Sequence, residues 1–413
     1  MKKLVFQFRK FEKAQILPIV AIGMVAIIGL AAILLDGGVL LANRRSAQAA
    51  ADAGALAGAR LSCLEKTKAE IEAEAWRYAV NLNNADASTT ATYDSGTGLV
   101  TVVAQKQQNS WFARIFGEDT LSAGASASAG CYFPSVSSYV LPLAFYYQTP
   151  PIKAGAADCG TDGTCALVNW DFTTLMNTLT ATSVTNLPLD DIYIVADKIK
   201  ICEKGTGTIV CAEMRVNDSG GNRQWINLTE VAGTSNLQKV IKYGLIKPLY
   251  TPAWINASPG ADTSVFRGDN FQNLAKVPGY ENYLARLVNV PLFTDYCPDM
   301  VSCSKVVSGD RLEYLVNNNQ PAYRLAGFAP FVVTCVTMSS KCEFGNCIPA
   351  KTGPNTTNKP ICPGYLASNP DPTKDKENDN AIEGYFVDGL PADMYTWGTG
   401  GVDAGIYIIS LSD

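Results

Sequence analysis

The chain has 413 residues, of which 47% are hydrophobic, and its 33 basic and 38 acidic residues give a net charge of −5. It contains no histidine, which excludes the Ser/His/Asp and Cys/His catalytic arrangements and histidine-ligated zinc. An acidic chain is also a poor match for the phosphate backbone of nucleic acid. We therefore expect a protein that is not an enzyme, has no cofactor or metal, and does not bind nucleic acid.

The first predicted element is a membrane anchor. A basic tail over residues 1–15 precedes an uncharged apolar run from Ile16 to Leu35. At about 1.5 Å per residue this run spans the roughly 30 Å hydrocarbon core of a bilayer. A secretory signal peptide is the alternative, but its apolar region is usually about 7–15 residues long and ends in a cleavage site. The longer run, which continues in a helical pattern, favours an uncleaved transmembrane helix over residues 16–41.

The charges beside the apolar run predict its orientation. Five basic residues precede the run: Lys2, Lys3, Arg9, Lys10 and Lys13. Only Arg44 and Arg45 follow it within about twenty residues, so the positive-inside rule places the N-terminus in the cytoplasm. All 12 cysteines follow the run, which suits disulfides in an oxidising compartment. We expect a single-pass protein of the cell membrane whose C-terminal region is extracytoplasmic, at the cell surface.

Helical character continues through residues 42–82, which we expect to form an extracytoplasmic stalk. Apolar residues recur there at helical spacing, and no proline interrupts them. Together with the membrane span they predict one helix up to residue 82. Ala50, Gly54 and Gly58 share one face without bulky side chains, which lets another helix approach closely. Either a helix of a partner protein or the chain's own domain could pack on this face.

Residues 83–131 are expected to form a strand-helix-strand unit that packs on the stalk. Leu99–Gln105 and Leu121–Ala129 have the pattern of strands, and the second strand has small residues on one face. Between them, Trp111–Phe116 has the pattern of a short amphipathic helix that ends at Gly117. This arrangement would return the chain alongside itself.

Residues 132–413 are expected to form a β-rich, cysteine-rich exterior domain. Segments rich in β-branched and aromatic residues alternate there with Gly, Pro and Asn turns. The predicted strands are Tyr139–Tyr146, Ile192–Cys202, Thr208–Val216, Trp225–Leu228, Arg286–Phe293, Tyr323–Thr337, Ile382–Val387 and Ile406–Ser410. Helices are expected only near Asn236–Tyr243 and Asp269–Lys276. The predicted fold class is α+β, with a long N-terminal transmembrane and stalk helix followed by a disulfide-stapled, mainly antiparallel β region.

The cysteines are expected to form disulfides rather than metal sites. Clustered metal-binding cysteines usually show CxxC spacing, and the chain contains no CxxC. The candidate pairs are Cys63 with Cys131, Cys159 with Cys165, Cys202 with Cys211, Cys297 with Cys303, Cys342 with Cys347, and Cys335 with Cys362. Sequence alone does not fix the connectivity.

Asp36 is the one acid at the end of the apolar helix. One interpretation is an ion pair with Arg44 or Arg45 of a neighbouring subunit. The other is an interfacial charge that faces lipid headgroups. Both place this carboxylate at the boundary of the membrane.

An acidic loop near the C-terminus offers a weak candidate calcium site. Its carboxylates belong to Asp371, Asp375, Glu377, Asp379 and Glu383, and carboxylate oxygens are the ligands that calcium prefers. The loop lacks the spacing and the glycine of an EF-hand. A solvated loop is therefore the simpler interpretation.

Several motifs together resemble a known family. Ala14-Gln15 precedes the apolar run, Asp36-Gly37-Gly38 ends it, and Asn43-Arg44-Arg45 and the small-residue segment from Ala49 to Ala59 follow. With the Leu99–Ala129 unit, these motifs resemble the TadE/TadG-like family of Flp (tight-adherence) pilus-assembly proteins. The resemblance implies a pilin-like, single-pass structural component of a tight-adherence pilus or surface assembly, as a minor pilin or an assembly anchor. It also implies pilin-like or pilus-assembly partners that contact the N-terminal helix, and self-association as a homo-oligomer.

The chain departs from pilins in two features of prepilin processing. No glycine precedes Gly23, and no glutamate lies within Ile16–Leu41. These absences favour a retained assembly component over a polymerising subunit. The alternative function is a membrane-anchored adhesin or other ligand-binding ectodomain.

Overall fold

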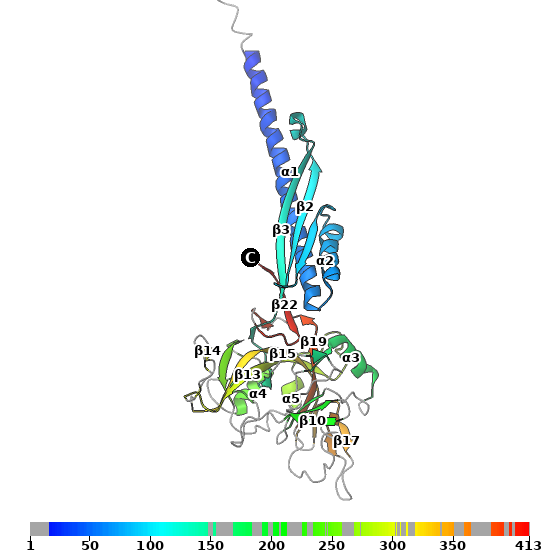
Figure 1. Ribbon diagram of the computed structural model, residues 1–413, viewed down its shortest axis with the longest axis vertical. Coiled ribbons are helices and arrows are strands. Elements are labelled where there is room, and N and C mark those ends of the chain that lie inside the picture. Colours follow the sequence, from blue (N-terminus) through cyan, green and yellow to red (C-terminus); the bar gives the residue numbers. More distant parts are fainter. Residues whose placement is uncertain are drawn as a thin grey trace, which may run out of the picture. The chain divides into compact units, whose positions relative to one another are not determined.

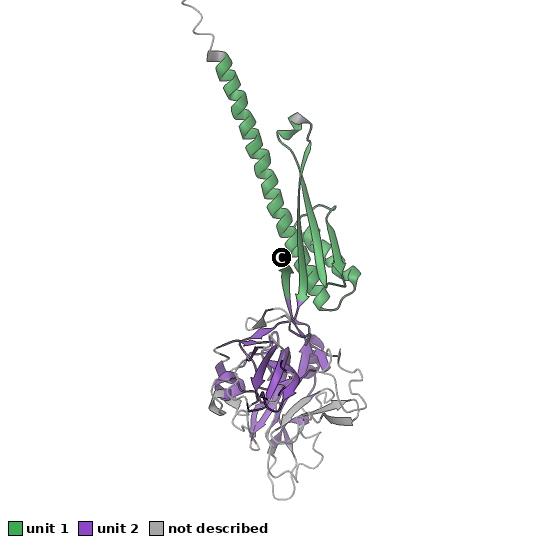
Figure 2. Ribbon diagram, turned by 60° about the vertical axis from the view of Figure 1, so that its left-hand side comes forward, with its two compact units in different colours: residues 1–131, 409–413 green, residues 132–408 purple. Residues whose placement is uncertain are grey.

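A computed structural model gives the fold of the chain. It describes residues 16–147, 152–153, 168–183, 192–196, 201–205, 208–212, 225–228, 234–243, 245, 247–257, 268–272, 274–301, 303, 306, 311–312, 319–338, 341–350, 359–364, 381–391, 396–398 and 401–412. The chain divides into two compact units, residues 1–131 with 409–413 and residues 132–408 (Figure 2).

Unit 1 consists of a long helix, a short second helix and a sheet that lies along the long helix (Figure 1). Its elements are α1 (Ile16–Cys63), α2 (Lys68–Arg77), a π-helical turn η1 (Tyr78–Leu82), β1 (Thr90–Asp94), β2 (Leu99–Asn109), a 3-10 turn η2 (Ala113–Phe116), β3 (Thr120–Tyr132) and the end of β22 (Ile406–Ser412). The strand order in this unit is β1-β2-β3-β22. The β1–β2 and β2–β3 pairs are antiparallel.

The two halves of α1 have different surfaces. From Ile19 to Leu35 its large apolar side chains are 51–73% exposed, and its most apolar stretch has the length and mean hydropathy, 2.7, of a membrane span. From Ala47 to Ala59, by contrast, buried small residues recur every three or four positions. One helix therefore has a first half suited to an apolar medium and a second half suited to packing under a sheet.

The helix ends at Cys63, so the prediction of a single helix up to residue 82 is wrong. Glu65 has a φ of 51°, a left-handed conformation that ends the helix. A new helix then begins at a capping box, in which the Thr67 N–H donates to the Glu70 carboxylate at 2.9 Å and the Glu70 N–H donates to the Thr67 hydroxyl at 3.4 Å. The hydrogen bonds from the Thr67 hydroxyl and N–H lower the pKa of Glu70. These local interactions turn α2 back onto α1.

Gly54 and Gly58 let α2 and β2 lie close to the α1 backbone. A Cβ atom at Gly54 would lie 2.7 Å from the Ala75 carbonyl oxygen, and one at Gly58 would lie 2.7 Å from a Val100 methyl carbon. Val100 and Val102 are buried at alternate positions of β2, as expected for a strand with one face on a helix. In the core of unit 1, the glycines of α1 therefore leave space that the branched side chains of β2 fill.

Unit 2 is a mixed sheet with short helices and smaller sheets around it. Its elements are β4 (Val136–Ser137), β5 (Phe145–Tyr146), β6 (Ile152–Lys153), β7 (Val168–Asp171), α3 (Phe172–Ala181), β8 (Tyr193–Ala196), β9 (Ile201–Gly205), β10 (Thr208–Ala212), α4 (Thr234–Tyr243), β11 (Leu249–Tyr250), β12 (Ala253–Asn256), α5 (Gly268–Gln272), β13 (Arg286–Cys297), β14 (Arg311–Leu312), β15 (Ala322–Met338), β16 (Lys341–Gly345), β17 (Ile348–Ala350), β18 (Lys359–Ile361), β19 (Ala381–Asp388), β20 (Leu390–Pro391) and β21 (Thr396–Trp397).

The centre of unit 2 is β15. It pairs antiparallel with β12, β13, β16 and β19, and almost all of its 17 residues are buried. Its Phe331 packs against Phe145 and Phe386, and the three ring centroids are 5.0–5.8 Å apart. This range is typical of interacting aromatic rings. A strand buried on both faces has a nearly continuous apolar sequence, as β15 does.

The predicted α+β fold class is confirmed, with several differences in detail. Parallel pairs such as β13–β5 and β19–β7 make the large sheet mixed. Within the described ranges, the predicted strand Trp225–Leu228 makes isolated bridges to Leu143 and Ala257 and no ladder. Residues 409–413 group with unit 1, although the sequence placed them in the exterior domain.

Helix α3 was not predicted from the sequence. This helix begins after Asp171, whose carboxylate accepts a hydrogen bond from the Thr174 N–H at 2.8 Å. Its buried side chains are Leu175, Met176 and Leu179. An N-cap residue followed by apolar residues at helical spacing was therefore present in the sequence.

A methyl group at position 54 tests the packing of unit 1. Gly54→Ala is expected to destabilise the α1–α2 contact by about 1–3 kcal/mol, the usual range for overpacking, because the Ala75 backbone must move. Gly38→Ala is the matched control in the same helix, since a Cβ atom there meets nothing within 4 Å. Hydrogen exchange of the α2 amides in the full chain measures the opening free energy. Equal protection in the two variants would contradict the packing.

Candidate functional site

The candidate site of unit 1 lies where the apolar half of α1 ends. The Asp36 side chain is only 8% exposed, and its carboxylate faces the tip of the β2–β3 hairpin. Its Oδ1 accepts a hydrogen bond from the Trp111 N–H at 3.0 Å. Its Oδ2 accepts from the N–H groups of Phe112 and Ala113 at 3.0 and 2.7 Å. We call these three hydrogen bonds the Asp36 tether.

The hairpin reaches Asp36 because β2 runs alongside α1 in the opposite direction (Figure 1). Val100 packs at Gly58, the Asn43 amide donates to the Gln108 side chain at 3.3 Å, and Trp111 reaches Asp36. The helix rises about 33 Å from Asp36 to Gly58, and the strand extends about 36 Å from position 100 to position 111. These nearly equal lengths bring the tip of the hairpin level with the end of the apolar run.

The tether satisfies a group that is otherwise expensive beside a membrane. A carboxylate next to hydrocarbon needs hydrogen-bond donors or a counter-charge, and hydrogen bonds to an ionised acceptor are stronger than those between neutral groups. The three N–H groups come from the turn that enters η2, where no strand or helix partner within the described part of the chain uses them. The carboxylate and the turn therefore satisfy each other.

The small-residue face of α1 is occupied within the same chain. Ala50, Gly54 and Gly58 are buried, and the two glycines face α2 and β2. Of the two alternatives that the sequence left open, the structure shows packing under the chain's own domain. Docking of a partner helix on this face stays a prediction.

Arg44 and Arg45 are exposed on α1. They lie two turns beyond Asp36, whose carboxylate is held by the hairpin tip. The predicted ion pair with a neighbouring subunit stays a prediction, since it needs a second chain.

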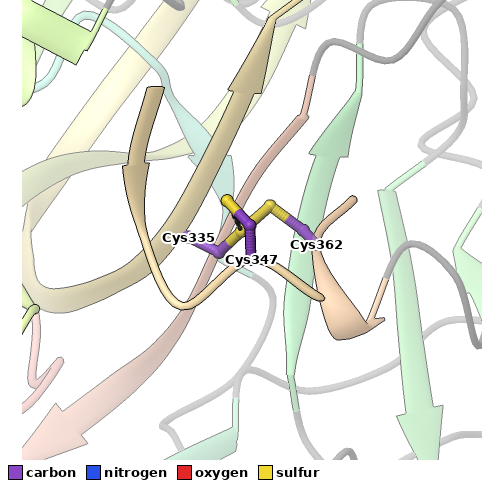
Figure 3. Close-up of side chains that lie close together, drawn as sticks. All are labelled: Cys335, Cys347 and Cys362. Atoms are coloured by element: carbon purple, nitrogen blue, oxygen red, sulfur yellow. Dashed lines mark hydrogen bonds between the residues drawn. A yellow bond between two sulfur atoms is a disulfide. The ribbon is translucent and has the colours of Figure 1, made fainter. Parts of the chain in front are cut away.

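Within unit 2 the structure brings four of the candidate cysteines into one cluster. Cys335 lies at disulfide distance from Cys362, and Cys342 from Cys347, with Cα–Cα distances of 5.8 and 5.9 Å. The sulfurs of Cys335 and Cys347 are 3.5 Å apart, so the two disulfides touch. Figure 3 shows Cys347 beside the Cys335–Cys362 pair. Three of these sulfurs lie close enough together to hold a metal ion. Zinc binding requires thiolates, however, which disulfide sulfurs are not.

The other candidate cysteines are placed as follows. Cys63 and Cys131 join the end of α1 to β3, with a Cα–Cα distance of 5.3 Å. Cys297 and Cys303 are 5.7 Å apart between their Cα atoms. Cys202 and Cys211 face each other in the β9–β10 register. Cys159 and Cys165 lie outside the described residues.

The weak calcium candidate has one described member, and the site stays a prediction. Glu383 lies on β19, is 1% exposed, and accepts a hydrogen bond from the Gly364 N–H at 3.0 Å. It holds the segment after β18 against the sheet, which is a structural role. The remaining candidates, Asp371, Asp375, Glu377 and Asp379, lie outside the described residues.

The partners of Asp36, which are Trp111, Phe112 and Ala113, were not predicted from the sequence. Their contribution is made by backbone N–H groups, which leave no signature in side-chain identity. Two signals were present: a lone acid at the end of an apolar helix, and a hairpin whose strand is long enough to reach it.

Removing the charge of Asp36 tests the tether. In Asp36→Asn, one acceptor oxygen is replaced by an NH₂ donor that faces backbone N–H groups, and the charge is lost. We expect the tip to open more easily by about 1.5–3 kcal/mol, the usual contribution of a hydrogen bond to a charged group. Hydrogen exchange of the peptide over residues 110–117 measures this change.

The matched control is Asp52→Asn. Asp52 lies on the same helix, and its carboxylate accepts a hydrogen bond from Gln48 at 2.7 Å, away from the hairpin tip. We expect no loss of protection over residues 110–117 in this variant. Equal exchange in both variants would show that the tether does not hold the tip.

Comparison with known proteins gives one match. No curated protein and no solved structure matches the chain. Residues 14–61 match the family model Tad, described as "Putative Flp pilus-assembly TadE/G-like". The match covers nearly all of α1, including the apolar run, Asp36 and the small-residue face. The predicted resemblance to TadE/TadG-like proteins is therefore confirmed over this segment.

Proposed function

We propose that the chain is a membrane-anchored structural component of a Flp-type (tight-adherence) pilus or related surface assembly, as an assembly anchor or a minor pilin. The observation that carries this proposal is the family match over residues 14–61. It is supported by α1, which joins a segment long and apolar enough to cross a membrane to a segment that packs under its own sheet. Such a helix connects a membrane to an exterior domain.

The anchor crosses the membrane once, with the N-terminus in the cytoplasm and the C-terminal region outside. The five basic residues before the apolar run and the two after it support this orientation. The cysteine pairs at disulfide distance agree with an oxidising exterior.

An anchor role fits the chain better than a polymerising role. No glutamate of the kind associated with prepilin processing lies within Ile16–Leu41. The small-residue face of α1 is filled by α2 and β2, so partner helices would meet the exposed apolar run or the opposite side of the stalk. These surfaces are open to pilin-like partners and to further copies of the chain.

Gene deletion in the cell that carries this chain tests the proposal. We expect pili to be lost while the pilin is still made, because an assembly component is missing. The full chain should restore the pili. Shearing then separates the two roles, since an anchor stays in the membrane fraction and a minor pilin leaves with the filaments.

The control replaces residues 16–41 with an unrelated cleavable signal sequence. This chain reaches the exterior without an anchor and should not restore pili. Normal pili in the deletion strain would contradict the proposal. Normal pili together with lost attachment to surfaces would instead support the adhesin alternative.

A further inference from the structure

The hairpin tip, residues 110–119, exposes two large apolar side chains. The tip is closed by a hydrogen bond from the Ser110 N–H to the Asp119 carbonyl oxygen at 3.0 Å. Trp111 is 71% exposed and Ile115 is 78% exposed. These side chains are at least as exposed as most of the large apolar residues in the first half of α1, which are 51–73% exposed. Large apolar side chains grouped on a surface mark a contact with another apolar medium.

The Asp36 tether fixes where this apolar group lies. Trp111 donates its N–H to the residue that directly follows the apolar run Ile16–Leu35. The end of the run marks the boundary between hydrocarbon and headgroups. Trp111 and Ile115 are therefore held at that boundary, beside α1 and in the same compact unit. Tryptophan is the residue enriched at this depth, because its ring is apolar and its N–H is polar.

The charges of the hairpin tip indicate whether electrostatic or apolar attraction would draw it to a membrane. The Arg114 guanidinium pairs with the Asp119 carboxylate at 3.2 Å, and Glu118 adds a negative charge. The tip thus has no excess of basic residues that would draw it to anionic lipid. An attraction to the membrane must come from the apolar side chains.

We propose that the hairpin tip is a second membrane contact, in which Trp111 and Ile115 enter the headgroup boundary of the leaflet that α1 leaves. This proposal rests on the anchoring part of the proposed function and not on its pilus part. A single transmembrane helix is free to tilt in the membrane. A second contact beside it limits the tilt of unit 1.

Fluorescence quenching in vesicles tests the proposal. The full chain is reconstituted in phosphatidylcholine vesicles and recovered by flotation. Its tryptophan emission is then measured with a lipid that carries a nitroxide near the headgroup, and separately with aqueous iodide. The chain has 6 tryptophans, so the Trp111 component is taken as the difference between wild type and Trp111→Phe. We expect the nitroxide lipid to remove most of this component, and iodide to leave it nearly unchanged.

Two variants serve as controls. Trp76→Phe removes a half-buried tryptophan of α2. The neighbouring Ala75 packs at Gly54, about 27 Å along α1 from Asp36. The component lost in that variant should not respond to the nitroxide lipid. Ile115→Gln keeps every tryptophan but removes half of the apolar group, and should weaken the nitroxide quenching even if Trp111→Phe folds poorly.

Each contrary result has a distinct meaning. A Trp111 component quenched by iodide places the tip in water and overturns the proposal. A component shielded from both quenchers means that protein covers the tip, for example a second copy, and also overturns it. If the nitroxide lipid quenched the Trp111 component only in vesicles that also contain anionic lipid, charge and not the apolar side chains would cause the membrane contact, and the proposal would be overturned. Failure to float with vesicles would overturn the anchor itself, whereas loss of the pilus role alone would leave all these measurements unchanged.

Discussion

An acidic side chain beside the hydrocarbon core of a membrane is unfavourable unless donors surround it, and three backbone N–H groups surround Asp36. Among the residues that the structure describes, these three N–H groups have no other hydrogen-bond partner. Satisfying one group therefore satisfies the others, and the hairpin tip is held at one level on the helix. The position of the sheet along α1, and the depth of Trp111 relative to the apolar run, both depend on this contact.

Close packing along the rest of α1 makes that contact reachable. Gly54 and Gly58 bring β2 against the helix backbone, so strand and helix run side by side without diverging before Asp36. The disulfide pair Cys63–Cys131 joins the C-terminal ends of α1 and β3, at the end of the β2–β3 hairpin that lies away from Asp36. The hairpin is thus held at both ends and along its length. Because this packing uses the small-residue face, the residues that match the Tad family also serve the internal architecture of unit 1.

Local sequence patterns predicted most helices and strands, but they could not predict contacts between residues that are far apart in the chain. The apolar run, the alternation in β2 and the continuous apolar sequence of β15 each identified an element. The break after Cys63 was missed because helical periodicity outweighed the capping box of Thr67 and Glu70, although that signature is visible in the sequence. The partners of Asp36 were not predictable, since they lie 75–77 residues away and contribute backbone groups only. The small-residue face of α1 was identified from the sequence, but what packs on it was not. A partner helix and the chain's own domain would both need the same small residues there.

The most direct test is a solid-state NMR measurement on the full chain in a lipid bilayer. The Asp36 side-chain carboxyl carbon is labelled with ¹³C and the Ala113 backbone nitrogen with ¹⁵N, and the dipolar coupling between them is measured. The 2.7 Å hydrogen bond between the Ala113 nitrogen and the Asp36 Oδ2 predicts a clear coupling, as expected for atoms on either side of one hydrogen bond. No measurable coupling would contradict the account, because the hairpin tip would then not be tied to the end of the apolar helix.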